Sequence, residues 1–261
     1  MEIYDRKYFL SECDGYKSFI ATRGIKLTRR LNKIYERIIE LKPKRILDFG
    51  CGRGELALVL SLSGIETYGV DNSCEAIEIS NETKKYWLNT NPEMKLDFIK
   101  LNNYLLPFKD DFFDVVVLSD TIEHLKEEEI SKIFIEIYRV LKKGGFLIIH
   151  TSPNKIFLNF GLKIYWLLAL INGLILPFNM KKMLPYGLKP PYHINEQSCY
   201  SIKKYLSKAK FKEIKLELWK NPHYVYYFLK EDRYIKLLNK IYWFLPIKQL
   251  FYSDIFAMGK K

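Results

Sequence analysis

The stretch ILDFGCGRGELAL, residues 46–58, decides the fold of this chain. A run of apolar residues enters a turn that contains Gly50, Gly52 and Gly54, and the segment that follows has the composition of a helix. Such a turn lets a ligand approach the backbone closely, because glycine has no Cβ and tolerates positive φ. The free N–H groups at the start of the helix add a positive dipole end. The stretch therefore predicts a site for a nucleotide-like cofactor.

The spacing of the glycines narrows the choice of cofactor. A dinucleotide site is typically GxGxxG, with a third glycine for close packing of helix on strand, whereas this turn reads GxGxG. No GKS or GKT follows, so the turn is not a P-loop. Asp71 stands seventeen residues after Gly54 at the end of the next apolar run. A carboxylate there can accept hydrogen bonds from both ribose hydroxyls of a nucleoside.

Short apolar runs alternate with helical patterns from Lys44 onward. The expected strands cover 45–50, 66–71, 96–102, 113–119, 146–152, 212–219 and 254–260, and the expected helices cover 54–64, 74–88, 127–145 and 196–209. Continuous apolar strands that alternate with helices indicate a parallel sheet covered on both faces.

Composition and charge set broader limits. The chain has 261 residues and a net charge of +12, enough for one well-buried α/β domain with additions. The charge suits nucleic acid, acidic lipid or a phosphorylated substrate, and it equally suits an ordinary lysine-rich surface. Four cysteines without a CxxC pair argue against a zinc site and a disulfide framework. The first residues, MEIYDRKYFL, lack the apolar core of a signal peptide, so a cytoplasmic protein is expected.

Four stretches stand in a telling order: LDFGCGRGELAL, GVDNSCEAIEIS, LLPFKDDFFDVVVLSDTIEHL and EIYRVLKKGGFLIIHTS. Together they resemble the class I S-adenosylmethionine-dependent methyltransferases, and in particular the small-molecule and lipid-intermediate group that includes the ubiquinone-biosynthesis O-methyltransferases. The resemblance covers residues 44–152 firmly and 195–219 weakly. It implies a Rossmann-like α/β fold. This fold has a seven-stranded, mostly parallel sheet, helices on both faces, an antiparallel last strand and, in this chain, an apolar helical insertion after strand five.

The resemblance also implies roles for the matching residues, with S-adenosylmethionine as the cofactor. Gly50, Gly52 and Gly54 approach the methionine part through their backbone, Asp48 helps to place its amino group, and Asp71 binds the ribose hydroxyls.

Further matches lie on the adenosine side of the implied site. Asn72 and Ser73 flank the adenosine, and Ser119 ends strand four beside the methyl donor. Asn102 stands where the family usually has an aspartate that binds the adenine amino group. The amide oxygen of Asn102 can accept the same hydrogen bond without charge, so we expect binding to be retained.

Methyl transfer requires alignment, exclusion of water and, for a hydroxyl acceptor, a group that takes its proton. Candidates are Asp120, Glu123 and His124, which share a helix face by spacing, together with His193 and His150. An alternative is that the histidines are structural. The acid-x-x-Glu-His run also resembles the metal site of some ubiquinone-type enzymes, but no metal is expected here.

The chain divides into four expected parts: an N-terminal helical cap (1–43), the cofactor-binding half of the core (44–152), an apolar insertion (153–191) and the rest of the core with a basic aromatic helix (192–261). In the cap, Tyr4, Tyr8 and Phe9 either shield the cofactor from water or belong to the ordinary core.

The insertion is apolar over 157–182, and its place between two strands of one sheet argues against a membrane-spanning helix. It is interpreted as a lid, a dimer interface or a contact with the inner face of a membrane, in which Tyr165 and Trp166 anchor the segment and Lys155, Lys181 and Lys182 meet head groups. The pattern of 232–252 predicts a second surface-seeking helix. A monomer or a homodimer is expected.

The function that these features favour is methyl transfer from S-adenosylmethionine to a small-molecule or lipid-linked, hydrophobic acceptor. An RNA methyltransferase is the first alternative, but SDTIEH stands where an NPPY-type motif would be, so nucleic acid is not expected as a partner. A cofactor-binding protein without catalysis is the second alternative.

Overall fold

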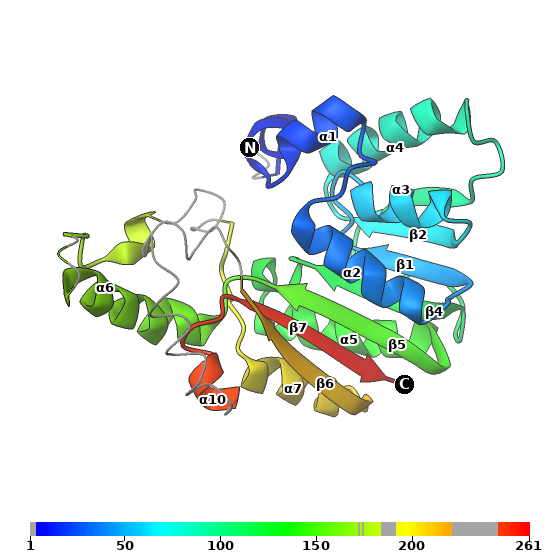
Figure 1. Ribbon diagram of the computed structural model, residues 1–261. Coiled ribbons are helices and arrows are strands. Elements are labelled where there is room, and N and C mark those ends of the chain that lie inside the picture. The colour runs from blue at the N-terminus through cyan, green and yellow to red at the C-terminus, as the bar shows by residue number, and fades with distance from the viewer. Residues whose placement is uncertain (1–3, 172, 174, 184–191, 221–244) are drawn as a thin grey trace.

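A seven-stranded sheet forms the centre of the protein (Figure 1). The computed structural model describes residues 4–171, 173, 175–183, 192–220 and 245–261. The strand order is β3-β2-β1-β4-β5-β7-β6, and β7 runs antiparallel to both of its neighbours. The strands are β1 (Arg45–Phe49), β2 (Glu66–Asp71), β3 (Leu96–Lys100), β4 (Phe113–Ser119), β5 (Leu141–Thr151), β6 (Lys212–Trp219) and β7 (Asp254–Lys260). The predicted Rossmann-like architecture with an antiparallel last strand is confirmed.

Helices cover both faces of the sheet. The α-helices of the described residues are α1 (Tyr16–Thr22), α2 (Arg29–Glu40), α3 (Glu55–Leu62), α4 (Cys74–Leu88), α5 (Glu127–Val140), α6 (Leu162–Ile171), α7 (Cys199–Lys208) and α10 (Leu245–Lys248). Apolar residues of α2 and α3 pack on one face, and those of α5 and α7 pack on the other. The central strands are therefore buried on both sides, which explains their uninterrupted apolar sequence.

Several boundaries differ from the predicted ones. The helix predicted over 127–145 ends at Val140, because Leu141 pairs with Phe113 and already begins β5. The third strand ends at Lys100. Of the helix predicted over 232–252, residues 232–244 lie outside the described part of the chain, and α10 covers Leu245–Lys248.

The insertion has a small apolar core of its own. It contains the π-helical turn η3 (Phe157–Gly161), α6 and the 3-10 turn η4 (Met180–Met183), and α6 extends away from the sheet in Figure 1. Tyr165 is 3% exposed. Its ring meets Phe157 and Phe251 edge to face.

The prediction that Tyr165 anchors the insertion in a membrane is therefore wrong, because its side chain lies inside the small core. Trp166 is half-buried, and its indole donates a hydrogen bond to the Leu176 carbonyl at 3.0 Å, so its predicted membrane contact stays a prediction. Among the helices that the structure describes, none combines the length and the apolar character needed to span a bilayer.

Candidate functional site

The glycine turn follows β1 at the carboxyl edge of the sheet, and sterics require two of its glycines. Gly50 has φ 76°, and a Cβ on it would lie 2.5 Å from the Thr121 hydroxyl oxygen. Gly54 has φ 81°, and its Cβ would lie 2.5 Å from the Phe98 ring. At Gly52 a Cβ would meet only Phe9, at 3.8 Å, among the residues that the structure describes, which leave the space beside the middle of the turn open.

The Asp71 carboxylate, at the end of β2, binds the turn from the side. One of its oxygens accepts a hydrogen bond from the Gly52 N–H and the other accepts one from the Ser73 N–H, both at 2.9 Å. A carboxylate oxygen has more than one acceptor position, so both oxygens can accept further hydrogen bonds from a ligand. Burial raises the pKa of Asp71, while the N–H groups of Ser73 and Gly52 oppose that rise.

Asp48 lies near the end of β1 and is buried. Burial, followed by the charges of Asp71 and Glu55, raises the pKa of its carboxyl to about 7. A cation placed beside this group would favour its charged form. The ammonium group of an amino-acid-like ligand meets that requirement.

The residues predicted around the adenosine differ in their exposure and in their hydrogen bonds. Ser73 caps α4 by accepting a hydrogen bond from the Ala76 N–H, and it donates to the Tyr4 carbonyl. Asn72 and Asn102 are exposed beyond the ends of β2 and β3. The Ser119 hydroxyl, at the end of β4, is buried without a hydrogen-bond partner among the described residues. Their contacts with a cofactor stay predictions.

A residue that the sequence reasoning missed fixes the N-terminal cap onto this turn. The Arg53 side chain is 3% exposed and forms an ion pair with Glu55 at 2.7 Å. Its guanidinium also donates to the carbonyls of Phe9 and Asp14 at 2.7 and 2.6 Å. The signal in the sequence was an arginine inside a glycine turn, two positions before an acid.

The N-terminal cap also contacts His124, which follows β4, and Tyr192, which precedes α7. Tyr4 contacts Nδ1 of His124 through its hydroxyl at 3.0 Å. Tyr8, in the π-helical turn η1 (Tyr8–Glu12), stacks on Tyr192 with a centroid distance of 4.9 Å. The cap therefore contacts both the segment after β2 and the segment after β4.

Asp120 does not join that group. It follows β4 with φ 49°, and it forms ion pairs with Arg30 at 2.7 Å and with His150 at 2.9 Å. Although burial raises the pKa of Asp120, Arg30 and His150 outweigh burial and hold the pKa well below its ordinary value. A carboxylate held by two cations is a weak base, so these ion pairs argue against Asp120 as the proton acceptor, and its catalytic role stays a prediction.

His150 takes part in the same ion pairs. Burial lowers its pKa, but Asp120 and then Asp254 outweigh burial and raise the pKa to about 9. Because this imidazolium is buried between two acids, it is not available as a proton acceptor at neutral pH. Its alternative assignment as a structural residue fits this geometry.

Glu123, His124 and His193 lie together instead, on the 3-10 turn η2 (Ile122–His124) and the segment before α7. One ligating atom from each lies within 4.8 Å of the others. Burial, then the charge of Asp120, raises the pKa of Glu123 to about 8. Burial, then His124, lowers the pKa of His193 to about 3. Such a group could coordinate a divalent cation, and it could also accept a proton.

The tautomer of His124 follows from its partners. Its Nδ1 lies 2.8 Å from the Tyr192 carbonyl, which can only accept, so we assign the proton to Nδ1. The lone pair of the neutral imidazole is then on Nε2. Burial lowers the pKa of His124, which favours this neutral form.

Comparison with known proteins agrees with this arrangement. Residues 47–149 match the sequence profile of a family described as "Methyltransferase domain". The chain is 32% identical over 143 residues to the demethylmenaquinone methyltransferase of Thermus thermophilus, covering 52% of this chain and 62% of that protein. It is 34% identical over 125 residues to the mouse mitochondrial ubiquinone biosynthesis O-methyltransferase, covering 48% of this chain and 32% of that protein. The chain thus spans less than two thirds of these relatives' length.

Over residues 47–149 the chain is therefore similar to a methyltransferase domain. Solved structures share its fold: a SAM-dependent methyltransferase from Archaeoglobus fulgidus has a TM-score of 0.58 at 22% identity, covering 94% of this chain and 99% of that one. The magnesium protoporphyrin IX methyltransferase of Synechocystis, with bound SAH, has a TM-score of 0.57 at 18% identity and covers 98% of both chains.

The cofactor of this domain class is S-adenosylmethionine, and the residues present fit it. Four features lie at one edge of the sheet. They are the open space beside Gly52, the remaining acceptor positions of Asp71, the buried Asp48 carboxyl and the Ser119 hydroxyl, which has no partner among the described residues. They offer acceptors for ribose hydroxyls and a countercharge for an ammonium group.

The Asp71→Asn variant of this methyltransferase domain should bind S-adenosylmethionine more weakly by roughly 1–3 kcal/mol, because hydrogen bonds to a charged acceptor are lost. Isothermal titration calorimetry measures the change. Glu66→Gln, at the other end of β2, is the matched control, since Glu66 pairs with Arg45 far from the turn. Equal affinities of Asp71→Asn and the native protein would refute the ribose assignment.

Affinity for S-adenosylmethionine should also depend on pH through Asp48. The carboxyl has a pKa raised to about 7, so it loses its proton as the pH increases through neutrality and then attracts the ammonium group. Between about pH 6 and pH 8 the charged fraction, and with it the affinity, should increase roughly tenfold. The Asp48→Asn variant should lose most of this dependence; an unchanged slope in that variant would contradict the assignment.

Proposed function

We propose that this protein transfers a methyl group from S-adenosylmethionine to a hydrophobic small-molecule acceptor, with His124 as the proton acceptor. The observation that carries the proposal is the contact between the glycine turn after β1 and the segment after β4 that contains His124. A Cβ on Gly50 would meet Thr121, and Thr121 stands three residues before His124. The cofactor turn and the candidate base are therefore neighbours at the same edge of the sheet.

S-adenosylmethionine supplies an activated methyl group when it is bound. His124 presents the lone pair of Nε2, because its Nδ1 proton is held by the Tyr192 carbonyl. An acceptor hydroxyl or amine that gains a methyl group must lose a proton, and Nε2 of His124 takes it. The imidazolium that results then returns the proton to solvent.

His193 completes this part of the site as a neighbour of the base. The His124 and His193 rings lie 4.7 Å apart at 81°, and Nδ1 of His193 is buried without a hydrogen-bond partner in the described part of the chain. A buried imidazole that is neutral and unpartnered can contact the acceptor and orient it. We therefore assign His193 to positioning of the acceptor.

Two observations support a hydrophobic acceptor. The tyrosine rings of the cap and of Tyr192 border the histidines, with Tyr4 at 5.8 Å from the His124 ring. Relatives of this chain include enzymes named for demethylmenaquinone and ubiquinone, and a sterol 24-C-methyltransferase of Schizosaccharomyces pombe. An acceptor carried in a membrane would be reached from the inner face through 157–182; the predicted contact through 232–252 lies mainly outside the described residues.

The acceptor class can be tested with methyl-labelled S-adenosylmethionine and fractionated cell extract. We expect label in the lipid or small-molecule fraction, because the described residues beside His124 include the aromatic rings of Tyr4 and Tyr192. Label in RNA would favour the alternative of an RNA methyltransferase. Cofactor binding without transfer to any fraction would favour the non-catalytic alternative.

Once an acceptor is known, His124→Gln should lower kcat by roughly 10²–10⁴-fold, the usual contribution of a general base. Its affinity for S-adenosylmethionine should be unchanged, and His193→Gln should mainly raise KM.

A chelator distinguishes the base from a metal site. We expect full activity in its presence, since proton transfer to His124 needs no cation. Loss of activity that Mg²⁺ restores would instead assign Glu123, His124 and His193 to a metal.

A further inference from the structure

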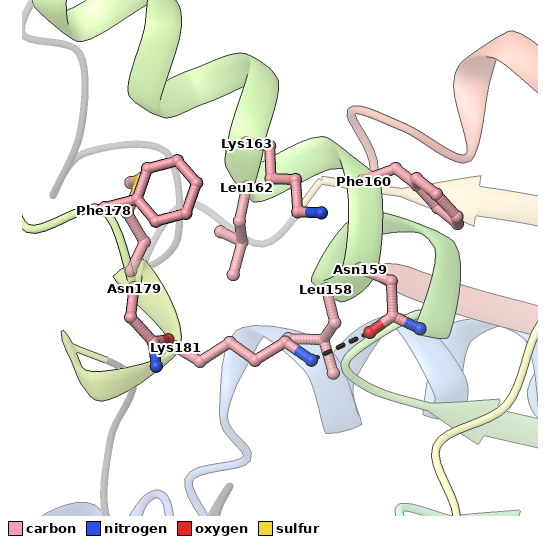
Figure 2. A pocket seen from close by; sticks show the side chains of 9 residues that line it. Leu158, Asn159, Phe160, Leu162, Lys163, Phe178, Asn179 and Lys181 are labelled. Atoms are coloured by element: carbon pink, nitrogen blue, oxygen red, sulfur yellow. Dashed lines mark hydrogen bonds between the residues drawn. The ribbon is translucent and has the colours of Figure 1, made fainter.

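A cavity lies in the insertion, apart from the residues proposed for methyl transfer. It has a volume of about 490 Å³ and lies between α6 and η4. Figure 2 shows that the aliphatic and aromatic side chains of Leu158, Leu162 and Phe178 form its walls, while Lys163 and Lys181 end at the same open space. Lys181 donates to the Asn159 side-chain oxygen at 2.8 Å, which fixes one ammonium group at the wall.

The face of the insertion around this cavity is apolar and exposed. Phe160, Leu167, Leu170 and Ile171 share one side of η3 and α6 at spacings of three, four and seven residues, and they are 55%, 50%, 49% and 68% exposed. Phe178, beside the cavity, is 70% exposed. Contiguous apolar side chains at such exposure mark an interaction surface.

The charge around this face has one sign. Residues 155–195 contain five lysines and no aspartate or glutamate. In the described part of the chain no carboxylate pairs with Lys163 or Lys181. A second copy of the chain on a symmetric interface would bring equal charges together, whereas an anionic surface would neutralise them.

The length of α6 decides how such a surface would be met. Ten residues rise about 15 Å, half of the ~30 Å hydrocarbon thickness of a bilayer. The helix is therefore too short to span and has the size of a segment that lies in the interfacial plane.

We propose that the cavity between α6 and η4 binds the phosphate-bearing head group of an anionic phospholipid, with the exposed apolar face inserted among the acyl chains. Lys163 and Lys181 provide the countercharge, and Phe160 and Phe178 flank the head group. The insertion leaves the sheet after β5, at the edge that carries His124, because His150 near the end of β5 pairs with Ser119 at the end of β4. Asn154 fixes the start of the insertion by donating to the carbonyls of Gln249 and Tyr252. The proposal names a partner for the proposed function and rests on it only for the delivery of the acceptor.

Flotation of the full-length protein with vesicles tests this proposal. We expect co-migration with vesicles of phosphatidylcholine plus phosphatidylglycerol, and little with phosphatidylcholine alone. The double variant Lys163→Gln/Lys181→Gln should bind the anionic vesicles roughly thirtyfold more weakly, since each lysine near an anionic surface contributes about 1 kcal/mol. Lys203→Gln/Lys204→Gln on α7 removes the same charge from another face and should bind almost as well as the native protein.

Three outcomes would overturn the proposal: no flotation of the native protein, equal weakening by the two double variants, or a dimer in light scattering that Leu167→Ser dissociates. Calorimetry with S-adenosylmethionine on the same samples shows that each variant is folded. It also separates the proposals, because intact cofactor binding and methyl transfer without vesicle binding would refute the lipid site alone.

Discussion

The bidentate contact of Asp71 with the backbone is the constraint on which the site depends. Its two oxygens accept hydrogen bonds from Gly52 and Ser73, so one carboxylate joins the turn after β1 to the start of α4. Parallel β1 and β2 bring these segments to the same edge, where Asp71 is the last residue of β2. Removal of the charge would release the turn and the helix from each other, and it would also remove the acceptors that face the ligand.

On the acceptor side of the site, the polar residues that follow β4 fall into two groups with different partners. Arg30, Asp120, His150 and Asp254 neutralise one another in the interior, which argues against the acid that follows β4 as a proton acceptor. Glu123 and His124 follow three and four residues later and have no charged hydrogen-bond partner among the described residues. Glu123 accepts from the Thr151 hydroxyl through one oxygen, its other oxygen has no partner there, and His124 contacts the Tyr192 carbonyl. Neighbouring positions in one short segment thus have different charge environments, set by which of them an arginine reaches.

Much of the fold was predictable from the sequence, because buried parallel strands need continuous apolar runs and the glycine turn needs residues without Cβ. The pairing of Asp120 with Arg30 was not, since it depends on how α2 packs across ninety residues of chain. His193 was predicted near the acceptor, but its approach to His124 became visible only in three dimensions. The prediction of Tyr165 as a membrane anchor failed because an apolar helix that packs in its own small core and one that faces a membrane have the same composition.

The hydrogen bonds of Arg53 have a consequence for the modularity of this protein. Arg53, in the cofactor turn, donates hydrogen bonds to main-chain carbonyls of the N-terminal cap. Tyr4 of the cap contacts Ser73 after β2 and His124 after β4. Hydrogen bonds thus join the cap to the core across the boundary that the sequence predicts near residue 43. A hybrid that places this cap on a relative's core would have to carry Arg53 with it, or the transplanted segment would lose its attachment.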